Sequence, residues 1–111
     1  MSWLTGGAKQ SDEAGDARAW EAVEEAIELL HEQRFIEAIV ELRRVLQDET
    51  RNAYAFRFLG TALFETDELE AARDAYRASL ALAPRYLGAR IDLSHTLRGL
   101  GDLRGAIEQG E

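Results

Sequence analysis

Two short patterns place a carboxylate and a histidine three residues apart, Glu28-x-x-His31 and Asp92-x-x-His95. On a helix such residues share a face, and di-iron helix bundles bind metal through pairs of this kind. Those sites also need the two motifs to face each other and two further glutamates. Here the patterns belong to helices two helix pairs apart, which implies a separation of roughly 20 Å at ordinary helix spacing. We therefore expect no metal site and no cofactor.

The side chains of a hydrolytic triad also occur close together, as Asp92, Ser94 and His95. Ser94 and His95 are adjacent, so on a helix they point to different faces. No glycine-rich stretch has the lysine and strand context of a phosphate-binding loop, neither Gly6-Gly7 nor Gly99-x-Gly101. The sequence therefore predicts a protein that is not an enzyme.

Composition narrows the classes of partner. The chain has 111 residues, with 21 acidic and 13 basic side chains and a formal net charge of −8. This acidic balance opposes binding to nucleic acid or to an anionic membrane surface. There is no cysteine, so disulfides and thiolate zinc sites are excluded. No apolar run approaches the ~20 residues of a membrane-spanning helix, and no export leader is recognisable, so we expect a cytoplasmic protein.

The apolar residues recur at three- and four-residue intervals from Ala17 onward, which predicts helix throughout. Residues 1–16 are small and polar and predict a disordered tail, although Trp3 and Leu4 in it could dock onto a groove. The expected helical segments are 17–31, 35–46, 53–65, 69–82, 86–98 and 102–109.

Local signals mark the ends of these helices. Asp67, three residues before Glu70, can cap the helix that starts near residue 69. Pro84 ends that helix, because proline cannot continue the hydrogen-bond ladder. Gly99 and Gly101 can adopt the left-handed conformation that terminates a helix, and a last short helix would open at residue 102. The pattern predicts six helices in three antiparallel hairpins.

Three alanines, Ala38, Ala72 and Ala106, follow one another at 34-residue spacing. The middle unit resembles the tetratricopeptide repeat (TPR). The large–x₂–Leu–Gly–x₂–large signature appears as Phe56-Arg57-Phe58-Leu59-Gly60-Thr61-Ala62-Leu63, and the small–x₃–aromatic signature as Ala72-Arg73-Asp74-Ala75-Tyr76, with Pro84 closing the unit.

The resemblance implies an all-α fold, an α-solenoid of antiparallel helix hairpins wound into a right-handed superhelix. The domain would span residues 17–111, with repeats over 19–52, 53–86 and 87–111, the last one incomplete. The resemblance also implies that Gly60 and Ala72 lie where the two helices of a hairpin cross closely.

In this family the first helix of each repeat lines a concave face that binds peptides. The resemblance places Arg57, His95 and Arg98 towards one end of this face and apolar side chains at the other. That arrangement suits a partner segment with an apolar anchor and an acidic group. Alternatively, the aromatic residues pack between helices and the arginines are solvated or paired with glutamates. The residues expected on the face are Trp20, Val23, Ile27, Leu30, His31, Tyr54, Arg57, Thr61, Phe64, Glu65, Gly88, Ile91, His95, Arg98 and Gly99.

The expected function is protein–protein interaction, as a scaffold or adaptor that binds a peptide segment in the concave groove. One alternative is a self-assembling scaffold, a homo-oligomer formed through the uncapped C-terminal end. Another, by analogy of fold alone, is a small chaperone of the secretion type. We expect no partner among nucleic acids or membranes.

Overall fold

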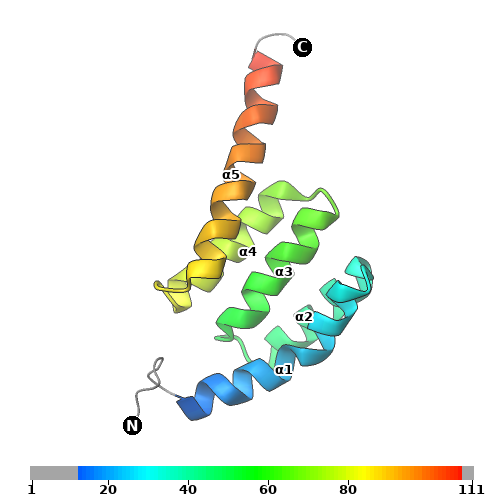
Figure 1. Cartoon of the computed structure of the whole chain (residues 1–111), viewed down its shortest axis with the longest axis vertical. Helices are drawn as coiled ribbons and strands as arrows, with labels where there is room; N and C mark the ends of the chain where they lie inside the picture. The colour runs from blue at the N-terminus through cyan, green and yellow to red at the C-terminus, as the bar shows by residue number, and fades with distance from the viewer. Residues whose placement is uncertain (1–12, 109–111) are drawn as a thin grey trace.

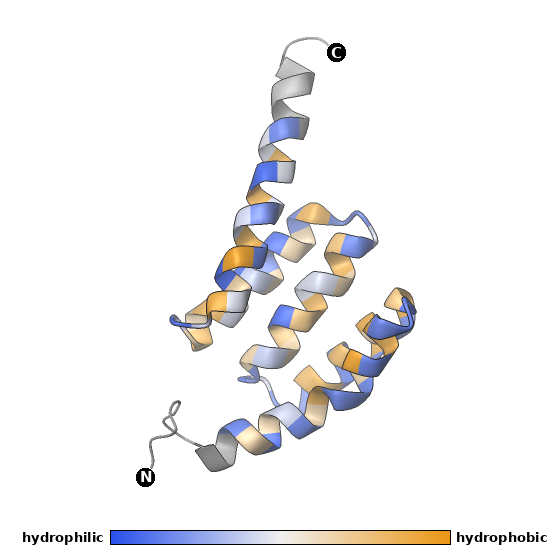
Figure 2. Ribbon diagram, in the orientation of Figure 1, coloured by the Kyte–Doolittle hydropathy of each residue, from blue (hydrophilic) through white to orange (hydrophobic). Residues whose placement is uncertain are grey.

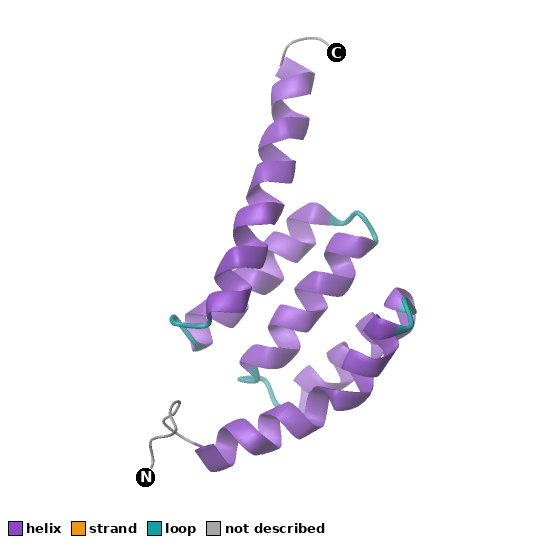
Figure 3. Cartoon of the chain, in the orientation of Figure 1, coloured by secondary structure: helices purple, strands orange, loops and turns teal. Residues whose placement is uncertain are grey.

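The computed structural model describes residues 13–108, and the side chains of residues 16–102. Five α-helices follow one another through short turns, and none of the described residues forms a strand (Figures 1 and 3). The expected all-α arrangement of helix hairpins is confirmed, because α1 packs on α2, α3 on α4, and α5 on α4. Of the expected 1–16 tail, residues 1–12, with Trp3 and Leu4, lie outside the described part, whereas residues 13–16 belong to α1 and not to a disordered tail. The helices are α1 (Glu13–His31), α2 (Phe35–Asp48), α3 (Ala53–Glu65), α4 (Leu69–Leu82) and α5 (Leu87–Glu108).

The third helix, α3, is the centre of the molecule and contacts each of the other four helices. Its sequence is accordingly apolar on most sides, whereas α2 and α4 each have one apolar stripe and one charged face (Figure 2). The buried core is continuous from α1 to α4 and consists of small and aliphatic side chains with one tyrosine: Val23, Ala26, Ala38, Ile39, Leu42, Val45, Ala55, Leu59, Ala62, Leu63, Ala72, Ala75 and Tyr76.

The two helices of the α3–α4 hairpin pack closely at Gly60, as the resemblance implies. A Cβ atom added at Gly60 would lie 2.7 Å from the ring of Tyr76. The ring of Tyr76 therefore rests directly on the backbone of α3, and only glycine leaves room for it. Ala72, one turn earlier on α4, is completely buried.

The α1–α2 and α3–α4 connections have the same structure, 34 residues apart. Gln33 and Asp67 have positive φ angles of 61° and 68°. Each follows a helix whose last carbonyls are satisfied in the Schellman pattern: Arg34 N–H donates to Leu29 C=O at 2.9 Å, and Glu68 N–H donates to Leu63 C=O at 2.8 Å. A period first seen in the sequence thus reappears in the backbone.

The expected capping role of Asp67 is wrong. Glu68 occupies the N-cap position of α4, and no side chain there makes a capping hydrogen bond. The reason is the tightness of the turn: Asp67 must adopt the left-handed conformation that ends α3, so it cannot also open α4. Pro84 does end α4, as predicted, since the helix stops at Leu82 and Ala83 is extended.

The expected break in the C-terminal helix is also wrong. Instead of one helix ending near Arg98 and a separate one starting at Asp102, α5 runs unbroken through Gly99 and Gly101 to Glu108. Each glycine costs about 1 kcal/mol in a helix interior. A separate helix of only about eight residues would be marginal in water, so continuing the hydrogen bonds of α5 is favoured. A third hairpin is therefore absent from the described residues.

Two buried polar side chains fasten the start of α3. Asn52 caps the helix by accepting from Ala55 N–H at 3.1 Å, and its amide donates to Ala19 C=O of α1 at 3.0 Å. Ser79 of α4 donates to Ala53 C=O at 2.8 Å. No helix in the described part of the chain has the length and apolarity needed to cross a bilayer.

Candidate functional site

A row of aromatic rings connects α1, α3 and the start of α5. Trp20 of α1 meets Tyr54 of α3 edge to face, with ring centroids 5.2 Å apart, and Tyr54 meets Tyr86 in the same way at 5.7 Å. Phe58, one turn beyond Tyr54, gives Trp20 a second edge contact at 6.0 Å. Such pairs are worth about 0.5–1.5 kcal/mol each beyond their buried area. The row therefore links α1 and α3 to Tyr86, the residue just before α5.

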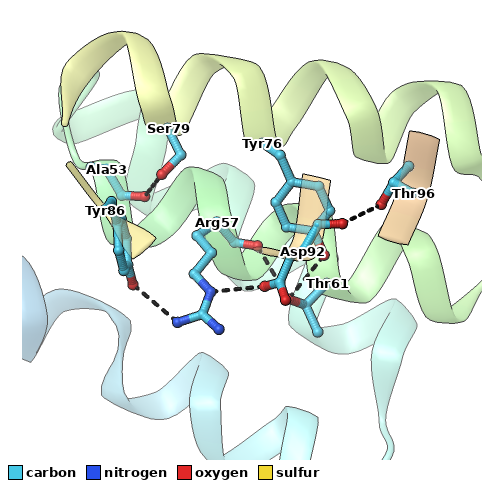
Figure 4. Close-up of polar contacts among 8 residues, drawn as sticks. All are labelled: Ala53, Arg57, Thr61, Tyr76, Ser79, Tyr86, Asp92 and Thr96. Carbon is cyan, nitrogen blue, oxygen red and sulfur yellow. Dashed lines mark hydrogen bonds and ion pairs between the residues drawn. The ribbon is translucent and has the colours of Figure 1, made fainter. Parts of the chain in front are cut away.

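Arg57 lies within this row and is engaged by residues of the chain itself. Its Nε donates to Asp92 Oδ2 of α5 at 2.9 Å, and its Nη1 approaches the Tyr86 hydroxyl at 3.3 Å (Figure 4). The guanidinium carbon lies 5.3 Å from the centre of the Phe58 ring and 5.4 Å from that of Tyr86. Burial lowers the pKa of Arg57, but the hydrogen bonds to Tyr86 and Asp92 outweigh it and leave this pKa above its ordinary value.

Gly88 makes room for this arginine. A Cβ atom added at Gly88 would lie 2.6 Å from the guanidinium carbon of Arg57, so the charged group rests against the backbone at the start of α5. Gly88, which the resemblance places on the binding face, therefore contacts Arg57 of α3.

Thr61, another residue expected on the binding face, makes its hydrogen bonds to other residues of the chain. The buried Tyr76 hydroxyl donates to Thr61 Oγ1 at 3.2 Å, and Thr61 in turn donates to Arg57 C=O at 3.3 Å (Figure 4). Burial is the main reason that the pKa of Tyr76 is raised to about 12. Thr61 thus supplies the partner that a buried phenol requires, and it is itself half-buried.

The other residues expected on the face divide into buried and exposed sets. Val23 is completely buried and is not open to a ligand in this structure, whereas Ile27 is partly buried and packs against the core. Three apolar side chains remain accessible: Trp20 at 41%, Phe64 at 36% and Ile91 at 47% of their surface.

Two basic groups remain open on α5. His95 and Arg98 follow Ile91 at four and seven residues, so the three side chains lie along one exposed side of the helix. Unlike Arg57, both are largely solvent-exposed. The accessible features are therefore a set of apolar side chains on α1, α3 and α5 and a short basic stretch on α5.

The sequence reasoning missed the partners of Arg57. Asp92 and Tyr86 are not among the residues that the sequence places on the binding face. One signal could have pointed to the ion pair: Asp92 stands 35 residues after Arg57, so a 34-residue stack places the two on adjacent units at almost the same height.

The described residues contain no group of three or more His, Asp or Glu side chains arranged to hold a metal ion. Asp92 in particular is directed to Arg57. No family model and no curated protein matches the chain. The site must therefore be interpreted from its own geometry.

Proposed function

We propose that this chain is an adaptor of the TPR type that binds a peptide segment of another protein on the face shared by α1, α3 and α5. The repeated left-handed turns at Gln33 and Asp67, together with the Gly60–Tyr76 contact, support the assignment to this class of repeat. The proposal includes a cytoplasmic location, which a chain free of cysteine permits.

The observation that carries the binding proposal is the state of Trp20. Its ring is held edge-on by Tyr54 and Phe58, yet 41% of its surface is exposed. A rigid, partly exposed tryptophan loses little conformational entropy on binding, and such residues are frequent anchors of protein interfaces. Phe64 and Ile91 add further accessible apolar surface.

The preferred partner carries an acidic group beside its apolar anchor. Arg57 is already neutralised by Asp92, so an incoming carboxylate would have to displace an existing ion pair. His95 and Arg98 carry no such ion pair within 4.0 Å among the described residues, and they stand next to Ile91. We assign to them the orientation of the ligand, a role in which charges give specificity more than affinity.

Selection from a random peptide display library tests this proposal without knowledge of the natural partner. We expect selected peptides to combine a large apolar residue with Asp or Glu, and to lose affinity at least about tenfold on Trp20→Ala or Arg98→Glu. Val40→Glu, at a 65% exposed position of α2, is the matched control and should leave affinity unchanged. Peptides that bind equally well to all three variants would exclude this face as the binding site.

A further inference from the structure

Leu63 and Leu97 occupy equivalent positions in successive repeats, but Leu63 is buried and Leu97 is exposed. They lie 34 residues apart, on α3 and α5 respectively, and their exposed fractions are 3% and 41%. The preceding residues, Ala62 and Thr96, are both completely buried, so the two helices present the same side to the core. The difference arises because α4 packs along α3, whereas no later helix of the described residues packs along α5.

The sequence that would cover Leu97 is present in the chain, but it lies elsewhere. Leu103 and Ala106 follow Leu69 and Ala72 of α4 by 34 residues. In the structure their backbone continues α5 in a straight line, and this end of the helix projects beyond α3 and α4 (Figure 1). A straight helix cannot place its last turns over its own middle, so the described residues leave this unit incomplete.

We propose that a second copy of this chain completes the unit, with the two α5 helices paired antiparallel and each covering Leu97 of the other. The partner is a second copy because the missing element has this chain's own sequence, and an antiparallel pair of identical helices satisfies both copies at once. This inference goes beyond peptide binding and uses a different side of α5.

The α3–α4 hairpin supplies the geometry of the pair. Its contacts, such as Tyr76 with Thr61 and Ser79 with Ala53, are arranged about the turn at Asp67. The residue 34 positions after Asp67 is Gly101. In the proposed dimer, the two-fold axis that relates the two copies therefore passes beside Gly101. A Cβ atom added there would meet nothing within 4 Å, which leaves the site open to close approach of the second helix.

The same 34-residue shift also predicts which side chains meet in the dimer. On α3 and α4, Leu63 and Ala72 follow the Gly60–Tyr76 contact by about one turn towards the connection, and both are buried. Their equivalents in the dimer are Leu97 of one copy and Ala106 of the other. The pairing thus covers the exposed Leu97, as Leu63 is covered within one chain.

Sedimentation equilibrium of the full chain over a concentration series tests the pairing. We expect a reversible dimer whose dissociation constant rises by more than about tenfold in Leu97→Glu, because a carboxylate would be buried in the contact. Val40→Glu, on an exposed apolar position of α2, should leave the dimer unchanged. A wild-type chain that stays monomeric throughout the series overturns the proposal, and so does a dimer that Leu97→Glu does not weaken.

Cross-linking tests the position of the axis. The chain has no cysteine, so a single introduced thiol reports on one position only. Gly101→Cys should oxidise readily to a disulfide-linked dimer, whereas Arg90→Cys, three turns away on the same helix, should not. Equal cross-linking of the two variants, or a dimer in which Gly101→Cys remains reduced, would contradict the antiparallel arrangement. Binding of the selected peptides is measured separately. If a variant loses peptide binding but still forms the dimer, that result bears only on the proposed function.

Discussion

Arg57 of α3 and Asp92 of α5 form an ion pair, with Nε and Oδ2 2.9 Å apart, across two helices that otherwise contact each other only lightly. Their side chains are 27% and 26% exposed, so water screens the pair only partly. Tyr86 and Phe58 flank the guanidinium. This cluster links α5 directly to α3, whereas the larger contact of α5 is with α4.

Replacing Arg57 with methionine should therefore destabilise the fold. Arg57→Met leaves Asp92 partly buried without its partner, which we expect to lower the free energy of unfolding by about 1–3 kcal/mol. Urea denaturation followed by circular dichroism measures the change. Arg98→Met, at an exposed position of α5, is the control and should stay within about 0.5 kcal/mol of the wild type. Equal losses in the two variants would show that the ion pair has no structural role.

Gly60→Ala should be destabilising by about 1–3 kcal/mol, because the new methyl group would overlap the Tyr76 ring. Gly99→Ala is the matched variant: its methyl group would lie 3.4 Å from a methyl group of Leu69, an ordinary contact distance. That change should stabilise the protein by up to about 1 kcal/mol, since alanine favours helix over glycine. Thermal melting of the two variants should thus shift in opposite directions, and a shift in the same direction would refute the assigned contacts.

Gln33→Gly should raise the stability by about 0.5–1 kcal/mol, because glycine adopts a φ of 61° without steric cost. Gln47→Gly, in the exposed face of α2, should instead lower it by a similar amount. Chemical denaturation midpoints compare the two. If both glycines lowered the midpoint, the left-handed turn after α1 would not form in solution.

Stability should fall in alkaline solution because of Tyr76. Its pKa is about 12 in the folded protein, against an ordinary value of 10.0. The unfolded chain therefore loses this proton first, and the stabilisation is complete below pH 10 and is lost as the pH rises towards 12. The loss amounts to about 2–3 kcal/mol. Denaturation at several pH values should show this decline in the wild type and a shallower one in Tyr76→Phe; identical declines would rule Tyr76 out as the cause.

Much of the helical framework could be predicted from the sequence because its causes are local. The apolar spacing in α2 and the proline after α4 act within one or two helical turns, and both predictions are confirmed. The close contact at Gly60 was implied by the resemblance to the TPR family and is also confirmed. The turn at Asp67 was misjudged, because one residue offered two local roles and the sequence alone does not rank them.

Which of these residues are exposed and which are buried depends on how the helices pack together. Nothing in the sequence around Val23 distinguishes a groove residue from a core residue, yet packing against α2 and α3 buries it completely. Likewise the charge of Arg57 is evident from the sequence, but its engagement depends on Asp92, on another helix.

The sequence by itself determined where the first four helices lie and the 34-residue period that relates them, because hydrogen bonds and apolar stripes within a helix involve only near neighbours. The tertiary structure alone decided that Val23 is buried, that Leu97 stays exposed, and that Arg57 is neutralised within the chain. Each of these depends on which other helix is available to pack against the residue, and that is a property of the assembled molecule.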